Sequence, residues 1–266
     1  MTLVACNTHR MRAWESMTVS VALLCRDSIV MASDSRATMR TPTGAKIVVS
    51  DESRKLYVVG DRFAVLHRGS TSLGGVDLLA DLRGLERGDG VPDRMSSCSD
   101  IVRLLATKWS DVNDASRRSD IYVGGYRANG VGEVWVLHLP GCEQVFKWRT
   151  PGGPYGATFY DSLSMLTRIL HGRDARILDQ PEVEAAELRE AINRFPLHVQ
   201  YNTMSQDTAR QYVLVLISFV LRIMPFASGV GAEPFTPDAG GPIQFLQLTP
   251  RLRRADIETL SAYGIL

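Results

Sequence analysis

The sequence lacks an apolar run long enough to cross a membrane as a helix. Its longest such run, at positions 212–227, is interrupted by Arg222 and Pro225, and we expect it to form a helix of the protein core. The first residues also lack the order of a secretory signal, because basic residues follow their short apolar stretch instead of preceding it. We therefore expect a cytoplasmic protein with no membrane partner.

Cysteines are few and widely spaced, and the charge is nearly balanced. The four cysteines contain no C-x-x-C pair, so we expect reduced thiols and no metal site. A formal net charge of +1 gives no general attraction to nucleic acid. The sequence also has no phosphate-binding P-loop. We therefore expect neither a cofactor nor a nucleic-acid partner.

The chain does contain enough apolar material for a large folded core. Apolar residues make up 45% of its 266 residues and charged residues 22%, which is typical of a globular domain. Strand-like segments come first, followed by two amphipathic helices, more strands, further helices and a last strand. This order predicts a layered α+β domain in which helices cover the faces of sheets.

Hydrophobic periodicity places these elements along the chain. Two buried strands joined by a polar turn are expected at 19–25 and 29–33, and together with the strands of 55–70 they predict a β-meander. Ser99 or Asp100 is the expected N-cap of the second helix. The other expected elements are helices at 70–88, 98–112, 157–172, 182–195 and 205–224, strands within 120–148, and a final strand at 241–248.

Asp34 follows directly on the second buried strand, where little water would reach its carboxylate. An unpaired buried charge is costly, so Asp34 requires a cation. Lys55 opens the next long strand, and an antiparallel arrangement would bring its ammonium beside Asp34. Arg36 is a competing partner. A purely structural ion pair is one interpretation of these residues.

Thr18 adds a chemical interpretation. It begins the first strand, which the hairpin turn lays beside the strand that leads to Asp34. A threonine hydroxyl becomes a nucleophile when a nearby base removes its proton, and a free α-amine on the same residue is such a base. In this hypothesis Asp34 orients Lys55, Lys55 polarises the hydroxyl, and the backbone N–H of Gly69 stabilises an oxyanion.

Three stretches resemble the proteasome β-type family of N-terminal nucleophile (Ntn) hydrolases, including bacterial proteasome-like peptidases; they are 18–38, 55–70 and 240–250. Sixteen positions separate Thr18 from Asp34, as in the family's nucleophile and catalytic aspartate. Fourteen positions separate Lys55 from Gly69, which is similar to the spacing of the family's lysine and oxyanion glycine. The resemblance therefore implies the same four catalytic residues.

The resemblance also implies a fold, a reaction and partners. The fold would be a four-layer αββα sandwich, formed as a single Ntn-hydrolase domain by residues 18–266. The reaction would be hydrolysis of peptide (amide) bonds through an acyl-enzyme on Thr18. The partners would be a peptide or unfolded protein substrate, further copies of the chain in a homo-oligomeric ring, and an ATP-dependent unfoldase.

Substrate contacts follow from the same resemblance. An extended peptide would add to the strands that come after Arg36 and after Gly69. Ala37, Thr38 and His67 would then lie near the pocket for the side chain before the scissile bond, and Arg36 would also be a substrate-binding residue.

Residues 1–17 form an extension before Thr18, and they leave three alternatives. The extension is a propeptide cleaved after Met17, or the start is mis-assigned and translation begins at Met17 with later removal of that methionine, or the extension is retained. Retention would block the α-amine and would make the protein an inactive structural subunit or a binding module of the same fold.

The chain departs from the family pattern at three further places. Lys46 is a rival for the role of Lys55, because the gap after Asp34 is longer than in the family. Asp238 stands before a Gly-Gly pair, where it is either a turn residue or part of the site. The segment 171–200 is an insertion relative to compact members of the family.

Overall fold

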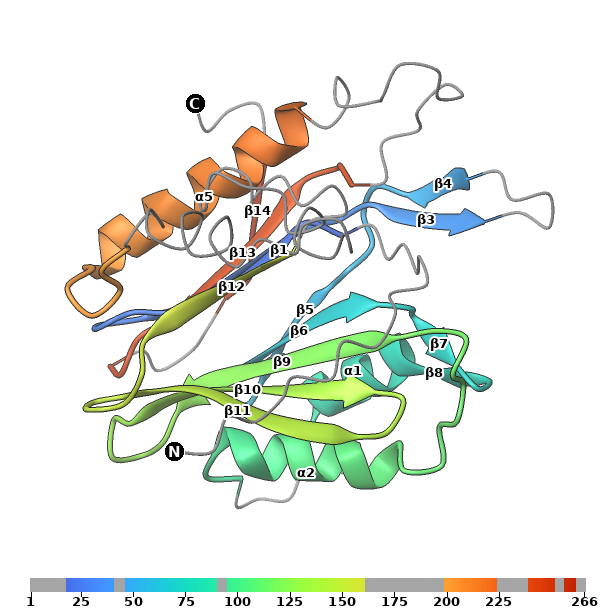
Figure 1. Ribbon diagram of the computed structural model, residues 1–266, viewed down its shortest axis with the longest axis horizontal. Helices are drawn as coiled ribbons and strands as arrows, with labels where there is room; N and C mark the ends of the chain where they lie inside the picture. The colour runs from blue at the N-terminus through green and yellow to red at the C-terminus, as the bar shows by residue number, and fades with distance from the viewer. Residues whose placement is uncertain are drawn as a thin grey trace, which may run out of the picture.

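Two five-stranded antiparallel sheets lie face to face at the centre of the fold (Figure 1). The computed structural model describes residues 18–40, 46–89, 95–160, 199–223, 239–251 and 256–261. The predicted helix at 182–195, most of the insertion at 171–200, Asp238 and the extension at 1–17 lie outside the described residues. None of the helices in the described residues is long and apolar enough to span a membrane.

The first sheet has the strand order β12-β1-β2-β13-β14. Its strands are β1 (Ser20–Leu24), β2 (Ile29–Asp34), β12 (Gly156–Tyr160), β13 (Ile243–Leu248) and β14 (Glu258–Leu260). Every residue of β1 and β2 is buried, as expected for strands that are apolar on both faces. A tight turn joins them, in which the Cys25 N–H donates to the Ser28 carbonyl at 2.9 Å. The predicted hairpin is therefore confirmed.

The second sheet has the strand order β11-β10-β9-β6-β5. Its strands are β5 (Leu56–Val59), β6 (Phe63–Gly69), β9 (Ser119–Tyr126), β10 (Gly132–Leu139) and β11 (Glu143–Thr150). Strands β9, β10 and β11 form a continuous meander, which confirms the strands predicted within 120–148. Strand β6 joins this meander to β5.

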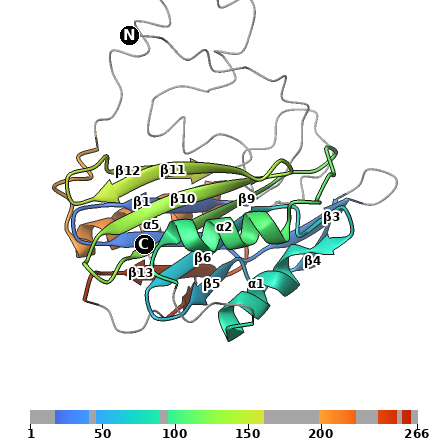
Figure 2. The same cartoon turned by 90° about the horizontal axis from the view of Figure 1, so that it is seen from below.

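In the described residues, three helices cover the outer faces of the two sheets (Figures 1 and 2). Helix α5 (Gln206–Ile223) packs on β1 and β2 of the first sheet, and confirms the long apolar helix. Helices α1 (Leu78–Arg87) and α2 (Cys98–Lys108) pack on the second sheet, against β5 and against β9 and β10 respectively. Between the sheets lies a third apolar cluster that includes Met31 and Leu66. The chain is thus a mixed α/β protein with mostly antiparallel sheets.

Side chains cap the N-terminal ends of α1 and α2. Asp77 accepts a hydrogen bond from the Ala80 N–H at 3.0 Å at the start of α1. At the start of α2, Ser97 and Asp100 form a capping box, in which each side chain accepts from the backbone N–H of the other residue. The N-cap is therefore Ser97, and the expectation of Ser99 or Asp100 was wrong because Asp100 occupies the third helical position.

The strands of the first seventy residues do not form one meander, so that prediction was wrong. Strands β1 and β2 belong to the first sheet, whereas β5 and β6 belong to the second. Between them, β3 (Ala37–Arg40) and β4 (Lys46–Ser50) form a separate two-stranded hairpin. This hairpin and the segment after it carry the chain from one sheet to the other. A second short hairpin, β7 (Ser72–Leu73) with β8 (Val76–Asp77), leads into α1.

Three further expectations were wrong at element ends. The helix predicted at 70–88 begins only at Leu78, because β7 and β8 precede it. The segment after Gly156 begins with strand β12, where a helix was predicted from residue 157. Ala157 and Phe159 alternate with Thr158 and pack toward α5, so the apolar side chains follow the two-residue period of a strand. The remainder of that predicted helix lies outside the described residues. Strand β13 confirms the strand predicted at 241–248, but β14 follows it.

Candidate active site

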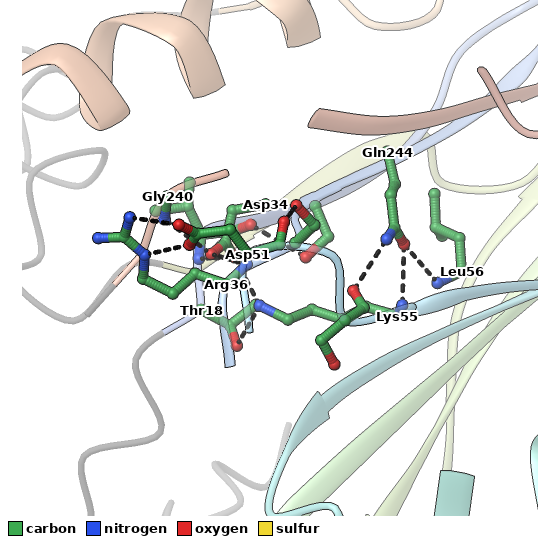
Figure 3. A network of polar contacts seen from close by, with 12 residues as sticks. Thr18, Asp34, Arg36, Asp51, Lys55, Leu56, Gly240 and Gln244 are labelled. Atoms are coloured by element: carbon green, nitrogen blue, oxygen red, sulfur yellow. Dashed lines mark hydrogen bonds and ion pairs between the residues drawn. The ribbon is translucent and has the colours of Figure 1, made fainter. Parts of the chain in front are cut away.

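Thr18, Asp34 and Lys55 meet between the two sheets (Figure 3). Thr18 lies two residues before β1, and Asp34 is the last residue of β2. Lys55 immediately precedes β5 of the second sheet. The predicted contact between Lys55 and Asp34 is therefore present, although not through pairing of neighbouring strands. Lys55 reaches Asp34 from the opposite sheet.

The ammonium group of Lys55 bridges the other two side chains. Lys55 Nζ donates to Asp34 Oδ1 at 2.8 Å and to Thr18 Oγ1 at 3.3 Å. Asp34 is fully buried, and Thr18 and Lys55 are each only 6% exposed. In such surroundings water screens the charges weakly, so the ammonium can polarise the Thr18 hydroxyl strongly.

Backbone N–H groups complete the environment of the Asp34 carboxylate. Oδ1 accepts from the Val19 N–H at 3.0 Å, and Oδ2 accepts from Gly240 at 3.0 Å and Arg36 at 3.2 Å. Burial raises the pKa of Asp34 above its ordinary value, while the Lys55 ammonium and these N–H donors act to lower it. The four donors hold the carboxylate in one orientation and satisfy both of its oxygens.

The side chain of Arg36 does not compete for Asp34 as its ion-pair partner. Its Nε and Nη2 instead donate to the two carboxylate oxygens of Asp51, at 2.6 and 3.1 Å. This pair lowers the pKa of Asp51. A Cβ atom at Gly240 would lie 2.7 Å from the Arg36 guanidinium carbon, so glycine at 240 allows the side chain to pass close to the backbone.

Gly69 ends β6 opposite Ser119, and its backbone requires glycine. Its φ angle is +109°, and a Cβ atom there would lie 2.5 Å from the Arg118 carbonyl oxygen. The hydrogen bonds that join Thr18, Asp34 and Lys55 do not include Gly69. Its role in an oxyanion hole therefore stays a prediction.

The residues predicted near the substrate pocket lie on two different elements. Ala37 and Thr38 are half-buried on β3, where they pair with Ser50 and Val48 of β4. His67 is buried on β6, with its Nε2 atom 3.0 Å from the Ser70 carbonyl oxygen and 2.9 Å from Ser119 Oγ.

Lys46, the alternative to Lys55 as the catalytic lysine, begins β4 at the far end of the β3–β4 hairpin, opposite Arg40.

His67 makes the stability of the protein depend on pH. Burial, with a smaller contribution from the Lys55 charge, lowers the pKa of His67 from 6.5 to about 4. Between these values the unfolded chain binds a proton that the folded chain does not bind. The free energy of unfolding should therefore fall by up to about 3 kcal/mol as the pH is lowered through this window. Denaturant titrations between about pH 7 and pH 4 measure the slope of the free energy of unfolding against pH, and His67→Gln should remove the part of this slope that His67 contributes. A slope that is the same in the variant and in wild type contradicts the assignment.

Sequence reasoning missed two residues that contact Asp34 or the backbone of Lys55. The Gly240 N–H donates to Asp34, and the Gln244 side chain contacts the backbone at Lys55. The Gly-Gly pair and an amide within an apolar strand were the available signals, but neither indicates a partner. Among the described residues, no group of three His, Cys, Asp or Glu side chains is arranged to hold a metal ion.

One curated protein is similar to part of the sequence. The chain is 35% identical over 117 residues to a proteasome subunit beta of Archaeoglobus fulgidus, a match that covers 42% of this chain. The chain spans about half the length of that relative, 51%. No family model matches the sequence.

Two solved structures share the fold. Anbu (ancestral beta-subunit) from Yersinia bercovieri superposes with a TM-score of 0.52 and 16% identity, over 91% of this chain and 86% of that chain. The Anbu complex of Pseudomonas aeruginosa, solved as a helical assembly, gives a TM-score of 0.51 with the same identity and coverage. These similarities show the fold, and together with the archaeal match they support the resemblance to proteasome-like proteins.

Proposed function

We propose that this chain is a threonine-type Ntn hydrolase that cleaves peptide bonds as a subunit of a proteasome-like assembly. The observation that carries the proposal is the bridge made by Lys55 Nζ between Asp34 Oδ1 and Thr18 Oγ1 in a buried site. The proposed unit is a single domain of residues 18–266 with the four-layer αββα architecture. Helix packing on the outer faces of both sheets supports that architecture.

The proposed reaction begins when the free α-amine of Thr18 removes the proton of its own hydroxyl. Thr18 Oγ1 attacks the carbonyl carbon of the peptide, Lys55 stabilises the developing charge on Oγ1, and the Gly69 N–H binds the oxyanion. The C–N bond then breaks, and the leaving amine takes the proton from the Thr18 ammonium. The α-amine of Thr18 then removes a proton from a water molecule, which hydrolyses the resulting ester. This step releases the acyl group and restores the Thr18 hydroxyl.

The hairpin of β3 and β4 supports the proposed binding of an extended peptide. Strand β3 follows directly on Arg36 and has β4 as its one partner in the described residues, so its other edge can pair with a substrate strand. Ala37 and Thr38 lie on this strand, and His67 lies two residues before Gly69 on β6. The proposed substrate is thus held between β3 and the end of β6.

The same hairpin supports the proposed assembly. Met39, Ile47, Val48 and Val49 are large apolar side chains that are between 38 and 60% exposed on β3 and β4. A two-stranded ribbon is marginally stable by itself in water, so cover from another chain would stabilise it. A ring of copies, and an ATP-dependent unfoldase that feeds it, are proposed partners.

Mass spectrometry of protein purified from its own host tests the proposal. Under denaturing conditions, a chain that begins at Thr18 has the free amine that the mechanism requires. Under native conditions, the same sample should have the mass of several copies. A chain that retains residues 1–17 contradicts the hydrolase assignment and favours a structural subunit, because the amine would be part of a peptide bond.

A further inference from the structure

Gln244 is a buried amide in a row of otherwise apolar side chains. It lies on β13 two residues before Leu246 and four before Leu248, and both leucines pack in the cluster between the sheets. Strand alternation places Gln244 on that same face. Its side chain is 7% exposed overall. A polar group in this position is unfavourable unless its hydrogen bonds are made.

All three hydrogen bonds of the Gln244 amide go to the backbone that carries Lys55 (Figure 3). Oε1 accepts from the Lys55 N–H at 2.8 Å and from the Leu56 N–H at 3.2 Å. Nε2 donates to the Ser53 carbonyl oxygen at 2.9 Å. One side chain thus holds both sides of the residue from which the ammonium projects.

On the other side, Gln244 belongs to the pair of strands, β13 and β2, that contains Asp34. On β13, Gln244 is paired with Ser33 of β2, and Ile243 is paired with Asp34. Gln244 therefore connects the strand beside Asp34 in the first sheet with the start of β5 in the second sheet. A lysine side chain has several rotatable bonds, so the 2.8 Å contact between Lys55 Nζ and Asp34 requires a fixed backbone at Lys55.

We propose that Gln244 is the positioning residue that holds the Lys55 ammonium between Asp34 and Thr18. Its amide sets the distance between the sheets at this point, and the ammonium then reaches both oxygens without rearrangement. The catalytic consequence rests on the proposed function, whereas the positioning of Lys55 against Asp34 does not depend on turnover.

Two matched variants test the proposal. Gln244→Met keeps the length of the side chain and removes its hydrogen bonds. Gln247→Met makes the same change on the opposite face of β13, where the amide contacts Ser28 Oγ and the Gln206 carbonyl oxygen. With a peptide amide substrate, Gln244→Met should lower kcat about tenfold to a hundredfold with little change in KM, and Gln247→Met should leave both near wild type.

A measurement without turnover separates this proposal from the proposed function. The Asp34 carboxyl group is titrated by NMR in the folded wild type and in both variants. Because the Lys55 ammonium lowers the pKa of Asp34, loss of its position should raise that pKa in Gln244→Met and not in Gln247→Met. Wild-type protein without peptidase activity then contradicts the hydrolase assignment alone, while an unchanged Asp34 titration in Gln244→Met overturns the role of Gln244.

A conservative variant keeps the test decisive if Gln244→Met does not fold. Gln244→Glu retains an oxygen that can accept from the Lys55 and Leu56 N–H groups. Hydrogen exchange should show both amides protected in Gln244→Glu at acidic pH, with an Asp34 titration close to that of wild type. Loss of protection at both amides together with a wild-type Asp34 titration overturns the proposal.

Discussion

Replacing Thr18 with alanine is expected to lower the rate of peptide hydrolysis on the order of 10⁴-fold or more, because it removes the proposed nucleophile. The hydroxyl is the atom that the Lys55 ammonium contacts at 3.3 Å, and no covalent intermediate can form without it. The fold should change little, since Asp34 retains its ion pair with Lys55 and its backbone donors. Hydrolysis of fluorogenic peptide amides, with thermal unfolding followed in parallel, measures both effects.

Two variants show whether the loss belongs to the nucleophile. Thr18→Ser keeps a hydroxyl on the same carbon and should retain part of the activity. Ser20→Ala removes another buried hydroxyl, two residues along the same chain segment, and should remain close to wild type. If Thr18→Ala hydrolyses peptides at the wild-type rate, a different residue attacks the substrate and the proposed mechanism is wrong.

The charged residues of the site could be predicted from the sequence, because a charged residue next to an apolar, buried strand needs a partner of opposite charge. Asp34 ends an apolar strand and must find a cation, and Lys55 opens the next apolar segment. The sequence left both Lys55 and Arg36 open as this cation, and in the structure Lys55 pairs with Asp34 while Arg36 pairs with Asp51. Sequence reasoning could not show that Lys55 contacts Asp34 from the opposite sheet. Contacts between two sheets depend on tertiary packing, and local periodicity carries no information about them.

The fold was predictable where one pattern, either a continuous apolar run or a regular strand or helix period, extends over a whole segment. The hairpin of β1 and β2, the meander of β9 to β11 and helix α5 are such segments. Strand β12 was missed, because apolar residues with helical spacing follow its five residues directly. The two segments together were therefore predicted as one helix. The sequence also does not distinguish Gln244 from Gln247, because both are glutamines within the same apolar strand. Only the packing of β13 shows that one amide faces Lys55 and the other faces the start of α5.

Replacing Lys55 with methionine is expected to destabilise the protein by about 3–5 kcal/mol, because it leaves a buried carboxylate without its cation. The variant keeps most of the apolar stem of Lys55 and removes the ammonium that Asp34 Oδ1 accepts from at 2.8 Å. The three backbone N–H donors to Asp34 remain, but they carry no full charge. Denaturant titration of both proteins at neutral pH measures the difference in the free energy of unfolding.

An ion pair of the same length at the surface supplies the control. Lys108 Nζ lies 2.8 Å from Asp81 Oδ1, but the Lys108 side chain is 50% exposed. Lys108→Met should therefore cost less than about 1 kcal/mol. A similar loss of stability in both variants would mean that the loss of Lys55 does not act through a buried charge.

The pH dependence of the Lys55→Met defect identifies its cause. Burial raises the pKa of Asp34 above 3.8, and removal of Lys55 takes away a charge that opposes this rise. Between 3.8 and the raised value, folded Asp34 holds a proton that the unfolded chain has lost. The folded variant then contains a neutral carboxyl group, so its deficit relative to wild type should be small at acidic pH and should grow as the pH rises. A deficit that is equal at acidic and neutral pH would indicate lost packing and would remove the electrostatic basis for the role of Lys55 beside Thr18.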